Sequence, residues 1–181
     1  ANAINRQTQL TGVRAVVNPN TMRGAAMSGT AVVSGSVTIN GFKTPEITTV
    51  LNNTRESRAA VVAAINFISD KTGIVAINSQ RDGEGIRLFA QDGRNIEIQF
   101  NDDITASAKE FSARTGLREG VQGSTYSLET KVEQTVTIRS ADDGDISRAR
   151  LSTATYIENE SNQVTDGREA VSSVDDVKYL K

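Results

Sequence analysis

The sequence lacks cysteine and histidine altogether in its 181 residues. Without cysteine there is no disulfide, no thiolate metal site and no cysteine nucleophile. Without histidine the usual general base near neutral pH and the commonest ligand of transition metals are missing. Because these absences exclude most hydrolase chemistries, we expect no enzyme here, with no catalytic residue, no cofactor and no metal ligand.

Aromatic residues are also scarce, and the net charge is small. Tryptophan is absent and aromatics make up 4% of the chain, while 37% is hydrophobic and 23% charged, a mixture typical of a folded chain with a thin core. The 20 basic and 22 acidic residues are spread along the chain, so no basic stripe exists for nucleic acid. The longest apolar runs, such as Ala59–Ile65, fall far below the roughly 20 residues that span a bilayer, so no membrane partner is expected.

A helix is the clearest element that the sequence does contain. Asn53 is expected to cap its start, with Glu56 three residues later completing a capping box. Gly73 is expected to end it, because glycine adopts the left-handed conformation at little cost. Apolar residues recur at helical spacing on one stripe, namely Val61, Ile65 and Ile68.

Alternating segments on both sides of this helix predict strands at residues 37–41, 74–78, 86–90 and 96–100. Asp92-Gly93 lies between the last two and predicts a type I′ hairpin that joins them. The apolar residues of that hairpin are expected to share one face and to pack on the helix. The predicted fold class is therefore α+β, with small antiparallel sheets and hairpins packed on one or two short helices.

Part of this pattern occurs twice. Residues 3–15 and 64–76 share Ala-Ile-Asn, a Thr-Gly pair and a later alanine at the same spacing, which indicates a helix end, a glycine stop and a strand start. A fainter third copy runs from Ala108 to Leu117. The opening residues 1–9 are interpreted as the end of a helix in a fragment of a longer polypeptide.

The other regions carry weaker signals. Residues 18–35 predict a long loop with a short strand at Thr30–Val33. Two segments, Ser124–Leu128 and Lys131–Arg139, predict strands that pair with each other, and Val174–Leu180 predicts a helix.

Five stretches, in fixed order, resemble the IN motif of flagellins: Val37–Gly41, Ala60–Asn66, Lys71–Ala76, Gly85–Leu88 and Asp92–Ile96. That module occurs in the outer domains of flagellins and in related hook-associated proteins. The resemblance implies modular flagellin-type outer domains: residues 1–35 as a partial first repeat and loop, 36–105 as the IN-motif α+β unit, and 106–181 as a second strand-rich unit with a polar tail. The last region and the first segments can form one continuous domain.

The resemblance implies a structural role in the extracellular bacterial flagellum, as a secreted, surface-exposed part of the filament that lacks the long polymerising helices of flagellins. Implied partners are other flagellin subunits through those missing terminal regions, an export chaperone for the full-length protein, and antibodies or host surfaces. The fragment itself is expected to be monomeric. The alternatives are a hook–filament junction or filament-cap protein, or a glycan-binding adhesion module, against which the poverty of aromatics argues.

Three acidic stretches are candidate sites. Residues 142–145, Asp-Asp-Gly-Asp, offer hard oxygen ligands for calcium but lack the 12-residue ligand spacing and closing glutamate of a calcium loop, so a solvated turn is favoured. Asn101-Asp102-Asp103 is expected to cap a helix that begins at Ile104. Glu158 and Glu160 could suggest a glycosidase pair, but no aromatic platform for a sugar accompanies them.

The sequence contains two further patterns that are typical of sites. Residues 81–85, Arg-Asp-Gly-Glu-Gly, have the glycines of a phosphate loop but lack its Lys-Ser/Thr end, so a turn is favoured. Asn52–Thr54 and Asn159–Ser161 match the Asn-linked glycosylation pattern, which arises often by chance. In a bacterial surface protein, sugars linked to serine or threonine are the better expectation.

Overall fold

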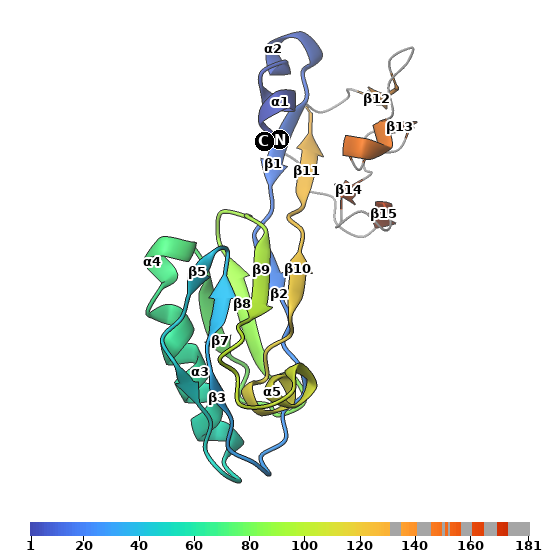
Figure 1. Ribbon diagram of the computed structural model, residues 1–181. Coiled ribbons are helices and arrows are strands. Elements are labelled where there is room, and N and C mark those ends of the chain that lie inside the picture. Colours follow the sequence, from blue (N-terminus) through green and yellow to red (C-terminus); the bar gives the residue numbers. More distant parts are fainter. Residues whose placement is uncertain are drawn as a thin grey trace. The chain divides into compact units, whose positions relative to one another are not determined.

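The computed structural model describes residues 1–130, 135–140, 146–149, 151, 153–156, 161–164 and 170–173. Contacts divide the chain into two compact units, coloured by sequence in Figure 1: unit 2 is Pro19–Gly123, and unit 1 combines Ala1–Asn18 with Ser124–Lys181. The fold class is α+β, built from small antiparallel sheets and short helices, as predicted. The module boundaries expected from the sequence are a different division and stay a prediction.

Unit 2 has a four-stranded sheet in the order β10-β9-β4-β5, a three-stranded sheet in the order β2-β8-β7, and the pair β3-β6. All of these pairings are antiparallel. The elements are β2 (Asn20–Met22), β3 (Ser34–Gly35), β4 (Val37–Ile39), β5 (Phe42–Lys43), β6 (Ile47–Thr48), α3 (Thr54–Asn66), α4 (Ser69–Thr72), β7 (Val75–Asn78), β8 (Ile86–Ala90), β9 (Ile96–Phe100), α5 (Ala108–Thr115) and β10 (Gly120–Gln122).

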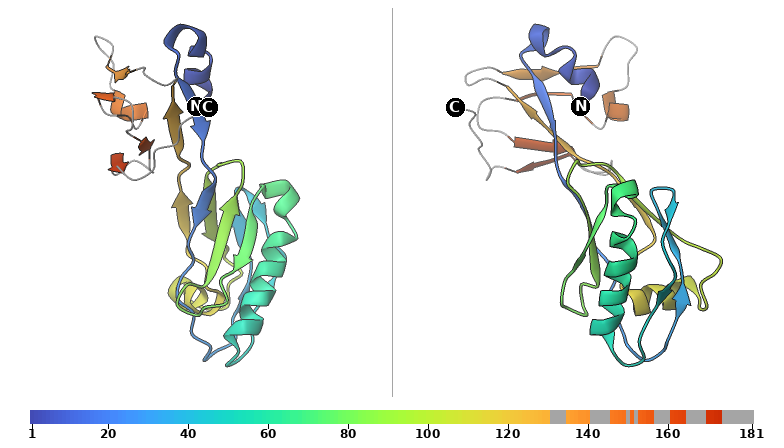
Figure 2. Two further views of the ribbon diagram at one scale, coloured as in Figure 1. Left: turned by 180° about the vertical axis from the view of Figure 1, so that it is seen from behind. Right: turned by 90° about the vertical axis from the view of Figure 1, so that its left-hand side faces the viewer.

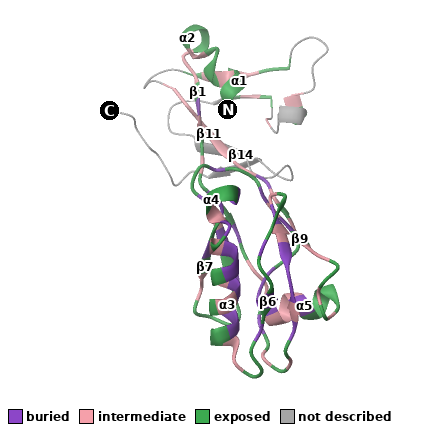
Figure 3. Cartoon of the chain, turned by 60° about the vertical axis from the view of Figure 1, so that its left-hand side comes forward, coloured by how far each residue is buried: buried purple, intermediate pink, exposed green. Residues whose placement is uncertain are grey.

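The predicted helix is confirmed at both ends. The Asn53 side chain accepts a hydrogen bond from the Glu56 N–H, and Gly73 ends the segment with φ 70°. A break at Phe67 and Ile68 divides the segment into α3 and α4. Burial follows the predicted stripe of α3, which faces the sheets in Figure 3 while the opposite side of the helix is exposed.

The core of unit 2 forms between α3 and both sheets, and the two views of Figure 2 show α3 lying along the strands. The predicted alternation is correct, since Ile86, Leu88, Ile96 and Ile98 are at most 2% exposed. Phe100 lies at the margin of this core, where its ring meets that of the buried Phe111 of α5 edge to face at 5.1 Å.

The predicted hairpin is wrong. Strand β8 pairs with β7 and β2, whereas β9 pairs with β4 and β10, so the two strands belong to different sheets. A type I′ turn needs positive φ at both central residues. Only Gly93 has it, with φ 70°, while the Asp92 carboxylate binds Arg94. The turn therefore carries the chain from one sheet to the other.

The long loop before β4 is partly ordered into strands. Asn20–Met22 forms β2 against β8, held by the Asn20 side chain, which donates to the Arg94 and Gln122 carbonyls. The strand expected at Thr30–Val33 lies instead at Ser34–Gly35, where the backbone pairs with β6. These pairings are distant in sequence, so the local composition did not reveal them.

Unit 1 has the sheet order β1-β11-β14-β15 and a separate pair β12-β13. The pairing expected between Ser124–Leu128 and Lys131–Arg139 is wrong, because β11 pairs with β1 and β14 while β12 pairs with β13. The helix expected at Val174–Leu180 lies outside the described residues. The elements are α1 (Asn2–Asn5), α2 (Thr8–Thr11), β1 (Arg14–Val17), β11 (Tyr126–Glu129), β12 (Val136–Ile138), η1 (Ile146–Ala149), β13 (Ala154–Tyr156), β14 (Ser161–Val164) and β15 (Ala170–Ser173).

The chain leaves and re-enters unit 1 at neighbouring positions. The Asn18 N–H donates to the Thr125 carbonyl at 3.0 Å, and the Ser127 hydroxyl donates to the Asn18 side-chain oxygen at 3.2 Å. Unit 2 is thus inserted between two adjacent, hydrogen-bonded positions. Over the described residues, no helix has the length and apolar character needed to cross a membrane.

Candidate functional site

Threonine followed by glycine ends a helix in the same way three times. Each threonine hydroxyl donates to the carbonyl four residues earlier and accepts the N–H two residues later, at Thr11, Thr72 and Thr115. Each glycine is left-handed and its N–H bonds to the carbonyl four residues earlier, at Gly12 (φ 71°), Gly73 (φ 70°) and Gly116 (φ 72°). The faint third copy in the sequence therefore shares this stop.

An asparagine closes the edge of a sheet twice. Asn66 accepts from the Ala76 N–H at 2.7 Å and donates to the Ala76 carbonyl at 3.2 Å; Asn5 does the same to Ala15 at 2.7 and 2.9 Å. Both alanines lie on the outermost strands of their sheets, β7 and β1. Unpaired groups on such an edge can template pairing with another chain. The repeated Ala-Ile-Asn thus has a physical role: the side-chain amide takes the place of a neighbouring strand.

A buried arginine fastens the turn after β7 to helix α3. Arg58 is 5% exposed and donates to the Asn78 side chain at 3.1 Å and to the Asp82 carboxylate. Hydrogen bonds from Arg58 and then Thr54 hold the pKa of Asp82 below its ordinary value. Residues 81–85 form a turn, as favoured from the sequence, and the carboxylate is directed to a cation of the protein itself.

Asp103 ties the end of β9 to the start of β4. It accepts from the Ser36 N–H at 2.9 Å and hydroxyl at 2.8 Å and pairs with Lys43 at 2.9 Å. The Lys43 ammonium and these Ser36 bonds lower the pKa of Asp103 to about 2. The expected cap at residues 101–103 is wrong: α5 begins at Ala108 and Ser107 caps it, because Asp103 is engaged by Ser36.

Three glycines bring three segments into backbone contact. The Gly116 carbonyl accepts from the N–H groups of Ala25 and Ile86 at 3.0 and 3.1 Å. A Cβ added at Gly24 or Gly85 would collide with that carbonyl, and Gly85 also has φ +60°. Sequence reasoning missed this junction, since its members lie far apart in the chain and only the glycines mark it.

The other candidate positions show no group of reactive side chains where the structure describes them. Asn52 is exposed with φ 52° next to the capping Asn53, whereas residues 142–145, Glu158, Asn159 and Glu160 lie outside the described residues. A surface depression of about 410 Å³ is lined by Asn2, Asn5 and Arg6, which offer no acid–base pair. Within the described part of the chain, no cluster of three or more Asp, Glu, His or Cys could hold a metal ion. The expectation of no catalytic, cofactor or metal site stays a prediction.

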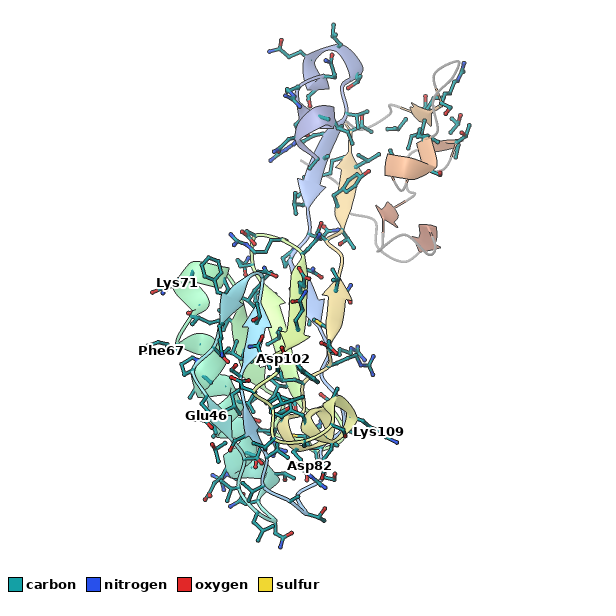
Figure 4. All side chains as sticks on the ribbon, in the orientation of Figure 1. Glu46, Phe67, Lys71, Asp82, Asp102 and Lys109 are labelled. Atoms are coloured by element: carbon teal, nitrogen blue, oxygen red, sulfur yellow. The ribbon has the colours of Figure 1, made fainter. Side chains whose placement is uncertain are left out.

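The surface of unit 2 carries both exposed apolar and exposed charged side chains. Phe67 is 78% exposed, and Figure 4 labels it together with Lys71 and Lys109 on the outside of unit 2. Val75 and Ile77 of β7 are 44% and 41% exposed. Isolated apolar residues are normal on a soluble surface, so these mark no specific site by themselves.

Comparison with known proteins finds flagellins among the relatives of this chain. The chain is 31% identical over 127 residues to flagellin A of Helicobacter felis and 32% identical over 128 residues to flagellin A of Helicobacter pylori. No family model matches the chain, and no solved structure matches it. Each alignment covers 69% of this chain but only 23% of the relative, so the chain spans less than a quarter of the curated proteins that it matches. Over about two thirds of its length, this chain is related to flagellin.

Proposed function

We propose that this chain is a non-enzymatic, outward-facing part of a bacterial flagellar filament protein. The observation that carries the proposal is the similarity to flagellin A over 69% of the chain. The five stretches that resemble the flagellin IN motif support the finer assignment to an outer domain. In this role the chain adds surface and antigenic mass to an extracellular filament, and the polymerising contacts to neighbouring subunits come from terminal regions of the full-length protein.

The fold supports a structural role through the way it is stabilised. Side-chain hydrogen bonds fix the backbone at the Thr-Gly helix ends, at Ala76 of β7 and, through Arg58, in the turn after β7. A part that faces the medium must resist unfolding and pairing with other chains, and the Asn66 and Asn5 amides occupy one position on each of two strand edges, those of β7 and β1. The fragment by itself is a monomer in this proposal, with an export chaperone, antibodies and host surfaces as partners of the whole protein.

Immunogold electron microscopy of the source cells, with antibodies raised against residues 1–181, tests the assignment. We expect label along the whole length of the filaments, and none after the antibodies are absorbed with the purified chain. Label confined to the hook end or tip would instead identify a hook–filament junction or cap protein. Label away from flagella would overturn the proposal.

The adhesion alternative is tested separately by a glycan array probed with the purified chain. We expect no saturable binding to a defined sugar, because a chain with 4% aromatics and no tryptophan offers few stacking platforms for sugar rings. Saturable binding would favour an adhesion module over a purely structural part.

A further inference from the structure

The sheet β2-β8-β7 of unit 2 has a buried face and an exposed face. On the face toward α3, the side chains of Ala76, Ile86 and Leu88 are at most 4% exposed. The residues between them point the other way, because side chains alternate along a strand. Val75 and Ile77 of β7 lie on that outer face, and both are exposed. A strip of apolar surface therefore runs along β7.

Two arginines lie side by side next to this strip. Arg87 of β8 is opposite Ile77 on one side, and the β2–β8 register, continued by one residue beyond the end of β2, sets Arg23 opposite Arg87 on the other. Gly24 maintains this register, since its backbone lies against that of Ile86. Both arginines are exposed, and neither pairs with a carboxylate among the described residues. Like charges directly opposite each other destabilise a sheet, and an anionic partner relieves that repulsion. The arginines and the apolar strip together form the basic face.

The other sheet of unit 2 carries the opposite charge on its own outer face. The exposed Val121 of β10 lies opposite Glu97 of β9. The same register, continued by one residue before β10, sets Glu119 opposite Gln99. Neither carboxylate forms an ion pair among the described residues, whereas Lys43 at the far end of this sheet is already paired with a carboxylate of its own. Val121, Glu97 and Glu119 together form the acidic face.

We propose that the basic face of one copy of this chain binds the acidic face of another. The apolar side chains on both faces provide the surface to be buried, and the charges determine which face meets which. Because the two faces differ, the contact is head-to-tail, and each added copy leaves one face of each kind free. Exposed ion pairs and a few apolar side chains give a weak contact, so the chain stays monomeric when dilute. This inference does not rest on the proposed function.

Reversing the charge of each face separately, in the full chain, tests the contact. The basic-face variant combines Arg23→Glu with Arg87→Glu. The acidic-face variant combines Glu97→Lys with Gln99→Lys, both on the outer side of β9. Glu119 is left in place because its carboxylate accepts a backbone N–H at 3.0 Å and so has a structural role. Circular dichroism checks that each variant is folded.

Sedimentation velocity at low ionic strength, with protein up to about 1 mM, measures the association. We expect the unaltered chain to associate reversibly and to dissociate when salt is raised to about 0.5 M, because salt screens exposed charges. Each variant alone should associate at least about tenfold more weakly, since like charges then face each other. An equal mixture of the two variants should restore association, because each contributes one unaltered face. Variants that had merely lost their fold would not restore it.

A matched control separates the faces from net charge. Arg55→Glu with Lys109→Glu changes the net charge by the same amount as the basic-face variant, at exposed helix positions outside both faces, and should associate like the unaltered chain. Arg23→Gln with Arg87→Gln removes the charges without reversing them and should give a smaller loss in the same direction. The proposal is overturned if the unaltered chain does not associate, if either face variant associates normally, if the control weakens association equally, or if the mixture stays monomeric.

Discussion

Removing the asparagine that caps β7 tests the role assigned to the Ala-Ile-Asn sequence. Asn66→Ala deletes two hydrogen bonds to Ala76, whose backbone is nearly inaccessible because the residue is 4% exposed. A hydrogen bond contributes about 0.5–1.5 kcal/mol, and a buried group left unpaired costs about 1–3 kcal/mol. Alanine returns about 0.5 kcal/mol through its higher helix propensity. We therefore expect the free energy of unfolding of unit 2 to fall by about 2–3 kcal/mol.

The distribution of aromatic residues lets the two units be followed separately. Tyr126, Tyr156 and Tyr179 all belong to unit 1, whereas the longer helices α3 and α5 belong to unit 2. In urea, Asn66→Ala should lower the midpoint seen by far-ultraviolet circular dichroism by about 1–1.5 M for an m-value near 2 kcal/mol/M, and leave the tyrosine fluorescence transition in place. Asn5→Ala should move the tyrosine transition instead.

Two controls make this prediction strict. Ala63→Asn places the same amide at an exposed position of α3 and should cost only the propensity difference of about 0.5 kcal/mol. Asn66→Asp keeps the acceptor for the Ala76 N–H but sets a carboxylate against the Ala76 carbonyl, so it should also destabilise unit 2. A loss below about 0.5 kcal/mol for Asn66→Ala would refute the edge-cap argument.

Three further predictions follow from the contacts in unit 2. Gly85→Ala should lower the melting temperature by at least about 10 °C, because the added Cβ collides with neighbouring backbone and the residue has positive φ. Gly83→Ala, with open space around the added Cβ, should change the melting temperature little. Equal effects would refute the role of the glycine junction. Arg58→Ala should lower the free energy of unfolding in urea by about 2–3 kcal/mol, whereas Arg55→Ala, at an exposed position, should leave it almost unchanged. Equal losses would contradict the stabilising role of the Arg58 contacts. Asp103 has a folded pKa of about 2, below its unfolded value near 4, so its contribution is present above about pH 4 and is lost as the pH falls toward 2. Asp103→Asn should therefore flatten the pH dependence of the melting temperature in that window, and an unchanged slope would count against the Asp103 contacts.

The sequence predictions that are confirmed depend on residues close together in the sequence. The start of α3 depends on Asn53 and a bond to a residue three positions later, and the end of the following helix α4 depends on Gly73, so both were visible in a short window. The same holds for α5, which stops at Gly116 as the faint third copy predicts. Alternation likewise identified the buried positions of β8 and β9, because period-2 patterns depend only on which side faces the core.

Strand pairing was predicted poorly because it depends on distant partners. An Asp-Gly turn normally joins neighbouring strands, but here β8 pairs with β2 and β7, and β9 pairs with β4 and β10. Two of these partners, β2 and β10, lie in segments with weak patterns of their own. The junction of Gly24, Gly85 and Gly116 was equally inaccessible, since a glycine needed for close approach looks the same in sequence as one needed for a turn.

The hydrogen-bonded neighbours Asn18 and Thr125 have a consequence for how such a protein can evolve. Unit 2, residues 19–123, lies between them in sequence and is a self-contained cassette whose two ends meet the rest of the chain at one place. A gene can lose, exchange or duplicate that cassette, and a short turn is enough to rejoin the flanking strands. Variation in the cassette is thereby decoupled from the folding of the unit that carries it, and the same junction is the natural place to insert a foreign domain for display.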